Sequence, residues 1–367
     1  MDKTGELKMK RAAFAKINLA HLKHNLATIR KLVNPSKLMA VVKADAYGHG
    51  MLQVCKTLSD ADAFSVAYIS EAVELRNNGI KQPLVALQGF SSEEDLKFSV
   101  KHDIQVVMHH AEQLKILRSV GKVESLNVLL KVDTGMHRLG FEVEEFKSVL
   151  AEIKSYLSPS SNLRLMTHLA CADELENQAT LQQLDTFSSL ANEHTYEQSI
   201  ANSAGILAWP DSHRDWVRSG LALYGINPVK NHASSSAVDL RPVMSLHAPL
   251  ISIKRCKKGE KVGYGGDFCC PKDMVIGIIA IGYADGYPRH LKGTPRVAIG
   301  KNKAPVVGRV SMDMIAVDLD GINVQVGEIV EIWGESISVT EVAEHAETIS
   351  YELLCVAGNS VYKKYIQ

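Results

Sequence analysis

The sequence has no excess of charge of either sign and no long apolar run. Lys and Arg together number 41, and Asp and Glu together also number 41, so no net field favours a nucleic acid or another polyanion. The longest basic stretch, Lys254–Lys258, is typical of a solvated turn. No stretch reaches the roughly 20 apolar residues that a membrane span requires. The sequence therefore predicts a protein that acts on small molecules, with no nucleic-acid partner and no membrane.

Paired cysteines are also missing. The six cysteines show no CxxC spacing, and the adjacent Cys269 and Cys270 have a poor geometry for a mutual disulfide. This usage is typical of a reducing compartment. Residues 1–16 are mixed and charged, without the apolar stretch of a secretory signal. We therefore expect a cytoplasmic protein with no framework of disulfides and no metal site.

Apolar strands alternate with helical patterns through the first two-thirds of the chain. A length of 367 residues fits two domains, or one barrel with an appendage. Unalternating apolar strands are what a parallel sheet covered by helices requires. Eight of them, each followed by a helical stretch, favour a (β/α)8 TIM-type barrel, although a doubly wound open sheet has the same local pattern. The expected strands, the last two being the weakest, are Leu38–Val42, Ala63–Val66, Leu84–Leu87, Ile104–Met108, Leu126–Val132, Leu163–Thr167, Gln198–Ala201 and Trp216–Val217.

Start and stop signals mark the helices between these strands. Ser91 and Glu94 form a capping-box pattern. Ser70 is a candidate cap for a helix that Gly79 ends. The longer expected helices are Leu22–Leu32, Glu144–Tyr156 and Glu176–Asn192.

The pattern changes after the polar stretch Lys230–Val238. From Arg241 onward, short β-prone runs are broken by Gly, Pro and Asp, and helical periodicity is nearly confined to Val339–Thr348. We expect a barrel domain over residues 11–240 and a mainly β domain over residues 241–367. Within the first range, the partly alternating segment 11–19 stands outside the barrel pattern and is a candidate strand of the β domain. The expected strands of the second domain are Val275–Ile281, Pro295–Ile299, Ala304–Val310, Ile315–Leu319 and Ile329–Ile332.

Five of the expected barrel strands end in polar or reactive side chains. Because active sites of this architecture lie at the carboxyl ends of the strands, these side chains are expected to share one rim. A lysine that closes a dry strand loses its proton readily and becomes a nucleophile for aldehydes; the competing interpretation of Lys43 is a side chain that reaches out to solvent. The strand-end residues are Lys43, Lys131, Asp133, Met136, Arg138, His168, Asn202, Ser203, Arg218 and Gly220.

Small and hydroxyl-bearing residues at two neighbouring turns are a second signal. Residues 202–205 (NSAG) and 219–221 (SGL) fit a phosphate site with free N–H groups, or ordinary helix caps. His168 fits either a site histidine or a core histidine, and the two strand-end arginines fit site or surface positions. Tyr264 lies in the run VGYGG, which fits a phenol exposed beside a ligand or a plain hairpin turn. The residues alone leave these alternatives open.

Taken together, these segments resemble the bacterial alanine racemases, a family that depends on pyridoxal phosphate. Residues 40–50, AVVKADAYGHG, are closely similar to the cofactor-attachment signature of that family. The likeness covers nearly the whole chain in the family's order, and the conjunction is highly specific although each piece is short. The further segments are 131–140 (KVDTGMHRLG), 202–205 (NSAG), 218–225 (RSGLALYG), 262–265 (VGYG), 282–289 (GYADGYPR) and 312–313 (MD).

The resemblance implies a (β/α)8 barrel followed by a β domain, working as a head-to-tail homodimer. It implies that Lys43 holds the cofactor as a Schiff base and acts as a base on one face of the substrate, while Tyr264 from the second subunit acts on the other. Arg218 would bind the pyridine nitrogen, and His168 would lie between Arg218 and Tyr264. The remaining implied roles are cofactor binding by Tyr47, Asn202, Ser203, Gly220, Leu221 and Tyr351, substrate binding by Arg138, Met312, Asp313 and Tyr283, carbamylation of Lys131, and an entrance lined by Tyr283, Asp173 and Arg289.

The implied reaction is the interconversion of L-alanine and D-alanine, which supplies D-alanine for peptidoglycan. Two bases that flank a planar intermediate suit the inversion of a stereocentre, because a proton leaves one face and another arrives on the opposite face. The chain departs from the family at Ser311, where many members have cysteine, and after Cys355, where a common arginine is missing. The alternatives are a serine or broad-specificity racemase, a basic amino-acid decarboxylase, against which Arg218 argues, and a single-barrel pyridoxal-phosphate homeostasis protein, against which residues 241–367 argue.

Overall fold

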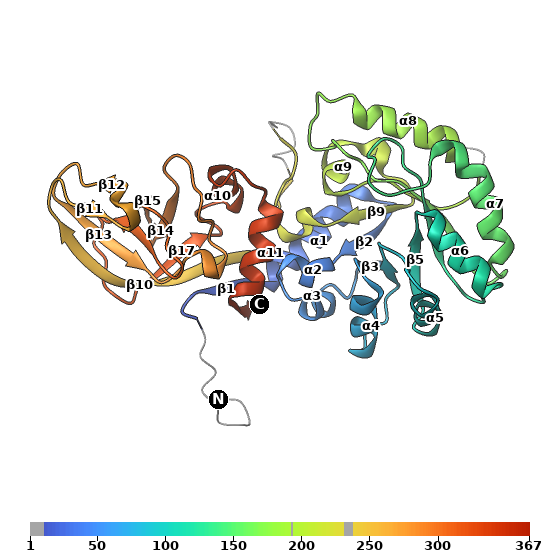
Figure 1. The fold of residues 1–367 in the computed structure, drawn as a ribbon, viewed down its shortest axis with the longest axis horizontal. Coiled ribbons are helices and arrows are strands. Elements are labelled where there is room, and N and C mark those ends of the chain that lie inside the picture. The colour runs from blue at the N-terminus through green and yellow to red at the C-terminus, as the bar shows by residue number, and fades with distance from the viewer. Residues whose placement is uncertain (1–10, 192–193, 231–237) are drawn as a thin grey trace, which may run out of the picture. The chain divides into compact units, whose positions relative to one another are not determined.

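The computed structural model describes residues 11–191, 194–230 and 238–367, and the chain forms two compact units (Figure 1). Of the described residues, those in 21–46 and 51–241 form the barrel unit, and residues 11–20, 47–50 and 242–367 form the β unit. The chain therefore enters the β unit three times. Most of the polar stretch Lys230–Val238 lies outside the described residues, as do residues 1–10 and Asn192.

The barrel unit contains eight parallel strands that close on themselves, because the last strand pairs with the first through Lys37 and Trp216. Closure confirms the predicted barrel and rules out the open sheet. Each strand is fully or largely buried, which explains why its sequence does not alternate. The strands are β2 (Lys37–Val41), β3 (Ala63–Val66), β4 (Leu84–Ala86), β5 (Ile104–Met108), β6 (Val128–Lys131), β7 (Leu163–Met166), β8 (Gln198–Ser199) and β9 (Trp216–Ser219).

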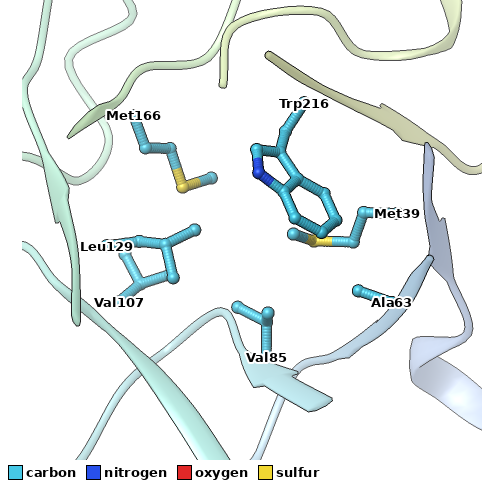
Figure 2. Close-up of a cluster of buried hydrophobic side chains, with 7 residues drawn as sticks. All are labelled: Met39, Ala63, Val85, Val107, Leu129, Met166 and Trp216. Atoms are coloured by element: carbon cyan, nitrogen blue, oxygen red, sulfur yellow. The ribbon is translucent and has the colours of Figure 1, made fainter. Parts of the chain in front are cut away.

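The interior of the barrel is filled by one apolar layer to which seven of the eight strands contribute (Figure 2). The side chains point towards one another and are at most 4% exposed, so the barrel is a packed core and not a channel. Because side chains alternate along a strand, the residues two positions later point to the same interior. The layer consists of Met39, Ala63, Val85, Val107, Leu129, Met166 and Trp216.

Helices cover the outside of the ring of strands (Figure 1), and the two predicted capping residues, Ser91 and Ser70, are not the caps. The cap of α5 is Ser92, one residue later than predicted, and its Oγ accepts the N–H of Asp95 at 3.1 Å. Ser70 lies inside α4, where the carboxylate of Glu71 instead accepts two N–H groups of the preceding turn. The helices are α1 (Leu19–Val33), α2 (Lys43–Tyr47), α3 (Met51–Thr57), α4 (Ile69–Asn77), α5 (Glu93–Lys101), α6 (Ala111–Val120), α7 (Phe146–Tyr156), α8 (Ala179–Ala191) and α9 (Ser203–Ala208), with 3-10 turns η1 (Val143–Glu145), η2 (Pro210–Ser212) and η3 (Leu221–Tyr224).

The β unit is built on an eight-stranded sheet in the order β13-β16-β15-β14-β17-β10-β1-β18. Strand β1 pairs antiparallel with β10 and parallel with β18, so the N-terminal segment lies inside this sheet. A short hairpin, β11 and β12, carries Tyr264 at its tip. The strands are β1 (Phe14–Asn18), β10 (Met244–Cys256), β11 (Lys261–Val262), β12 (Phe268–Cys269), β13 (Met274–Ile279), β14 (Arg296–Ile299), β15 (Asn302–Val307), β16 (Ile315–Asp318), β17 (Ile329–Trp333) and β18 (Tyr362–Ile366), with 3-10 turns η5 (Tyr264–Gly266) and η6 (Tyr283–Asp285).

Strands β10, β11, β12 and β18 and helix α11 of the β unit were not predicted. Helix α10 (Val339–His345) falls in the expected helical stretch, but α11 (Ser350–Ser360) follows it where no helix was expected. Its last turn contains Gly358 and Asn359, which have low helix propensity, and tertiary packing overrides that preference. Strand β10 runs through Pro249 and an irregularity between Leu250 and Ser252, both of which disguise its length in the sequence. Within the described ranges, the longest helices are too short or too polar to cross a membrane.

Candidate active site

The interior of the barrel changes from apolar to polar and basic side chains within two residues along the strands. Two residues beyond Leu129, Met166 and Trp216 of the apolar layer stand Lys131, His168 and Arg218. The alternation of side chains along a strand places all three on the interior face, at the carboxyl ends of β6, β7 and β9. The structure therefore brings together three of the residues predicted for one rim.

Arg218 anchors this group. Its side chain is buried and its Nη1 donates to Ser199 Oγ at 2.7 Å, while its Nη2 donates to the carbonyl oxygens of Thr167 at 2.8 Å and Ile200 at 3.0 Å. Burial lowers the pKa of Arg218 to about 10, so the guanidinium stays protonated at neutral pH. A planar cation held by three fixed acceptors has one orientation only.

The contact between Arg218 and His168 fixes the tautomer of the imidazole. Nη2 of Arg218 lies 3.1 Å from Nδ1 of His168. Because a guanidinium only donates, Nδ1 must accept, sharing one of the two Nη2 hydrogens with a carbonyl oxygen, and the ring proton must stand on Nε2. Burial lowers the pKa of His168 well below its usual range, and the charges of Arg218 and Lys131 lower it further. His168 is therefore a neutral imidazole with an N–H group on Nε2.

A buried glutamine of α8, which was not predicted as a site residue, supports this histidine. Gln183 donates from Nε2 to the carbonyl oxygen of His168 at 2.9 Å and accepts at Oε1 from the N–H of Ala170 at 2.8 Å. Near this glutamine, the hydroxyl oxygens of Thr134 and Thr167 lie 2.8 Å apart. The only sequence signal for Gln183 is a polar side chain on the buried face of an amphipathic helix.

Lys131 is a buried amine among cations. Its side chain is 6% exposed, and within the described ranges its Nζ has no hydrogen bond and no ion pair. Burial lowers the pKa of Lys131 to about 8, and the charges of Arg218, Arg138 and Lys43 act in the same direction. The neighbouring carboxylate of Asp133 raises it, but that carboxylate accepts three backbone N–H groups of its own turn. The rim therefore has a surplus of positive charge.

Lys43 is followed by a strained turn. One residue separates it from the end of the barrel strand β2, and its charge acts on both Lys131 and His168. The next four residues, Ala44 to Tyr47, have φ between 52° and 55°. A left-handed conformation costs about 1–2 kcal/mol for each residue with a side chain. Such strain persists where surrounding contacts enforce it, and it concentrates at functional sites.

Two carboxylates of the barrel unit hold the strained turn. Glu71 accepts the N–H of Ala44 at 3.1 Å, and Asp45 accepts the N–H of Met51 at 2.7 Å. The side chain of Lys43 is half-buried. The turn thus fixes the backbone next to a lysine whose charge acts on Lys131 and His168.

The two turns predicted to hold a phosphate meet through Ser203. Its Oγ accepts the N–H of Gly220 at 2.9 Å and that of Ala222 at 3.3 Å. Asn202 does not join them with its side chain, because its Oδ1 caps α9 through Gly205 N–H and its Nδ2 donates to the carbonyl oxygen of Leu169. Leu221, also predicted here, begins the turn η3. A hydroxyl and at least two backbone N–H groups converge at this point.

Residues 47–50 dock on α11 within the β unit. The rings of Tyr47 and Tyr351 lie 5.8 Å apart, which brings together two residues predicted to bind the cofactor. Burial raises the pKa of Tyr47, so its phenol stays protonated. A β-carbon on Gly48 would lie 2.4 Å from the carbonyl oxygen of Leu354, and one on Gly358 would lie 2.1 Å from that of Gly48. Only glycines allow this approach of turn and helix.

Replacing Gly358 by alanine is therefore expected to destabilise the chain. The added methyl group forces the turn at Gly48 away from α11, and overpacking of this kind costs about 1–3 kcal/mol of unfolding free energy. Urea denaturation measures the change. Asn359→Ala is the control, because Asn359 is exposed on the same helix and alanine there only improves helix propensity. Equal stability of both variants would contradict the packing argument.

The other predicted residues of the β unit are mostly exposed. Tyr264 lies between Gly263 and Gly265, which have φ of 75° and 73°, and its side chain is 71% exposed. Met312 and Tyr283 are also exposed. Asp313 accepts a hydrogen bond from Arg11, which also pairs with the buried Asp285. Arg11 was not predicted as a site residue, and nothing in its local sequence pointed to these distant carboxylates.

The predicted entrance residues divide between the two units. Asp173 belongs to the barrel unit and pairs with Lys230 at 3.2 Å, whereas Arg289 belongs to the β unit and is exposed. Arg138 is exposed on the loop after β6. The roles of these residues stay predictions.

Comparison with known proteins agrees with this arrangement. A family model for the N-terminal domain of alanine racemase matches residues 17–228, and a model for the C-terminal domain matches residues 243–365. Alanine racemase from Aeromonas hydrophila is 45% identical over 361 residues, which cover 97% of this chain and 100% of that protein. The enzyme from Coxiella burnetii strain CbuG_Q212 is 46% identical over 349 residues, 94% of this chain and 96% of that protein.

Solved structures are similar over the same length. The biosynthetic alanine racemase of Pseudomonas aeruginosa matches with a TM-score of 0.92 and 39% identity, over 97% of this chain and 100% of that one. The Bartonella henselae enzyme, whose crystal structure has covalently bound pyridoxal phosphate, matches with a TM-score of 0.85 and 28% identity, over 97% of this chain and 99% of that one. With its barrel, its β unit and its cationic rim, the chain belongs to the alanine racemase family of enzymes.

Proposed function

We propose that the chain interconverts L-alanine and D-alanine with pyridoxal phosphate bound at the barrel rim and attached to Lys43. The observation that carries the proposal is the contact between Arg218 and His168 at the rim. Lys43 belongs to the same rim, because its charge lowers the pKa of His168. A decarboxylase of this architecture needs a carboxylate at the ring nitrogen of the cofactor, and the rim offers an arginine instead. An arginine donates a hydrogen bond to that nitrogen without giving up its proton.

The residues present fit this cofactor. Its aldehyde requires an amine, which Lys43 supplies, and its phosphate requires donors, among them the hydroxyl of Ser203, whose oxygen lies beside the N–H of Gly220. Its ring nitrogen requires a donor, and Arg218 makes no hydrogen bond through Nε to any residue of the described ranges. We assign Tyr47, Tyr351, Asn202 and Leu221 to the same cofactor, with Asn202 acting through the backbone of the cap that it forms.

When bound, pyridoxal phosphate supplies the electron sink that makes the α-proton of an amino acid acidic. The Lys43 amine takes that proton from, or returns it to, one face of the substrate. Arg218 keeps its own proton, so it limits the delivery of charge to the ring and thereby disfavours transamination. Arg138, Met312, Asp313 and Tyr283 are the proposed substrate contacts, with Asp173 and Arg289 at the entrance.

Tyr264 is the proposed proton carrier on the other face, and we infer that a second copy of the chain provides it. An isolated chain leaves this phenol 71% exposed, and a general base needs a dry, fixed position to act on one proton. His168 is a neutral imidazole with its proton on Nε2, which suits it to donate a hydrogen bond to the Tyr264 oxygen and stabilise the phenolate. The proposed assembly is a homodimer with shared sites.

Lys131 is the proposed site of a carbamate. A buried amine without an acceptor, surrounded by the charges of Arg218, Arg138 and Lys43, is unfavourable as a fourth cation. Reaction with CO2 turns the amine into an anion, which neutralises the surplus and can position Arg138. Only the unprotonated amine reacts, and a pKa of about 8 makes that form available near neutral pH.

Carbamate formation is expected to rise with pH through about 8, where Lys131 loses its proton. Below that pH the ammonium form does not react, and an ordinary lysine becomes reactive only about two units higher. Carbon-13 NMR of the holoenzyme under constant labelled CO2 pressure measures the carbamate, with Lys131→Ala to assign the signal. A midpoint at the pH of an exposed lysine would contradict the proposed environment.

Conversion of L-alanine to D-alanine by the holoenzyme, followed by chiral chromatography, tests the proposed function. We expect turnover in both directions and a racemic end point. Equal turnover of serine would favour the broad-specificity alternative, and a bound cofactor without turnover would favour the homeostasis protein. The supply of D-alanine for peptidoglycan and the cytoplasmic location stay predictions.

A further inference from the structure

A second histidine stands at the rim, on the other side of Lys131. Strands β5 and β6 pair in the register Val107 with Leu129 and Met108 with Leu130, and one more step in this register places His109 opposite Lys131. Val107 and Leu129 both point into the barrel, as Figure 2 shows, and alternation therefore directs His109 and Lys131 inward as neighbours. Neighbouring strands lie about 4.8 Å apart, which leaves the two side chains within reach of each other.

The imidazole of His109 presents a lone pair to the interior. Its Nε2 lies 3.0 Å from the carbonyl oxygen of Gln88, so Nε2 carries the proton and donates it. Its Nδ1 must then be an acceptor, and this atom is buried without a hydrogen-bond partner in the described ranges. Burial lowers the pKa of His109, and the charge of Lys131 contributes to the shift. The ring is thus neutral, with an unused acceptor.

A buried glutamine holds His109 in place. Gln113 on α6 accepts the N–H of His109 at 2.8 Å and donates from Nε2 to the carbonyl oxygens of Phe90 at 3.2 Å and Val107 at 3.3 Å. Gln183 holds the residues around His168 in the same way on α8. No step of racemisation uses His109, yet a buried side chain holds it in place. This indicates that His109 has a role at the rim.

The two neighbours are complementary, because Lys131 is a donor without an acceptor and His109 is an acceptor without a donor. We propose that His109 is a positioning residue for Lys131, whose Nζ–H it accepts at Nδ1 when the amine takes up CO2. This inference rests on the carbamate of the proposed function. With this N–H directed to the β5 side, the carboxylate of the carbamate is directed away from His109.

The uptake of CO2 also needs a proton acceptor, and His109 provides it. The lone pair of Nζ attacks the carbon of CO2, a C–N bond forms, and the electron pair of one C=O bond moves onto oxygen. One Nζ proton leaves to Nδ1 of His109 and passes on to water. The carbamate keeps one N–H group, which donates to the freed Nδ1.

Two substitutions separate this role from simple packing. His109→Phe keeps a planar ring but removes the acceptor, and we expect about tenfold weaker CO2 uptake, which corresponds to the loss of one buried hydrogen bond. His109→Asn keeps an acceptor close to the position of Nδ1, and we expect uptake within about twofold of the unmutated holoenzyme. The measurement is the carbon-13 carbamate signal as a function of labelled CO2 pressure.

The neighbouring His110 provides matched controls. It is exposed at the start of α6, where its ring accepts the N–H of Glu112, and His110→Phe and His110→Asn should both leave CO2 uptake unchanged. If His109→Phe fails to fold, His109→Gln replaces it, because its longer side chain displaces the acceptor. Unchanged uptake in the variant without an acceptor, or an equal loss in His109→Asn, would overturn the role of His109.

The carbamate signal and the racemase activity separate this inference from the proposed function. A carbamate signal that depends on His109 in a protein that does not racemise alanine would support this inference and defeat the proposed function. Racemisation without any carbamate signal at Lys131 would support the reaction and overturn this inference.

Discussion

Lys43→Ala is expected to lose at least about a thousandfold in the conversion of L-alanine to D-alanine, and to lose the covalent cofactor. The amine has two roles in the proposed function, attachment of pyridoxal phosphate and proton transfer on one face. Positioned proton transfer alone contributes about a hundredfold to ten-thousandfold. The left-handed turn after Lys43 holds the backbone beside this lysine. We therefore expect that no other lysine takes its place.

Borohydride reduction followed by peptide mass analysis locates the attachment. The peptide that contains Lys43 should carry the cofactor in the unmutated protein and no peptide should carry it in Lys43→Ala. Lys56→Ala is the matched control, because Lys56 is an exposed lysine on α3, close in sequence, and its removal should change neither activity nor attachment. A Lys43→Ala protein that keeps a substantial part of its activity would contradict the proposed roles of Lys43.

The barrel was predictable because its strands are buried on both faces. Runs such as Ile104–Met108 and Ala63–Val66 are apolar at every position, and the structure confirms both with the same bounds. The two weakest predictions, β8 and β9, are short and contain the polar Ser199 and Arg218, whose partners lie inside the site. Closure itself was beyond local sequence, because it depends on the pairing of residues 37 and 216 across the whole unit.

Which residues lie at the rim was easier to predict than their tautomers and their contacts with one another. A strand that ends in lysine or arginine is visible in the sequence, and the barrel rule places such ends together. The tautomer of His168 is not visible, because it depends on an arginine that arrives from β9. His109 was not predicted for the same reason. Its position beside Lys131 follows from the register of β5 with β6 and not from its neighbours in the sequence.

The β unit shows where local sequence is insufficient. Residues 47–50 sit between barrel elements in the chain, yet they pack on α11 more than 300 residues later. The glycines at 48 and 358 are individually ordinary, and only their mutual approach explains them. The same holds for Arg11, which meets Asp285 and Asp313.

Mixing Lys43→Ala and Tyr264→Phe subunits is expected to restore racemase activity that neither variant has alone. If sites are shared, a mixed dimer has one site with both residues intact, since Lys43 comes from one chain and Tyr264 from the other. Random assortment makes about half of the dimers mixed, each with one working site of two, so about one quarter of the unmutated activity should return. Tyr264→Phe alone should lose about a hundredfold to ten-thousandfold, because phenylalanine keeps the ring and removes the proton carrier.

The mixture distinguishes a shared site from a site made by one chain. Two affinity tags isolate the mixed dimer after joint refolding, and its activity is compared with that of each parent. In the control, Tyr264→Phe is mixed with a chain that carries both substitutions, which should restore nothing, because no site then receives an intact tyrosine. Failure of the first mixture to exceed this control would mean that the exposed Tyr264 serves its own chain or no site at all, and the proton carrier on the second face would have to be sought elsewhere.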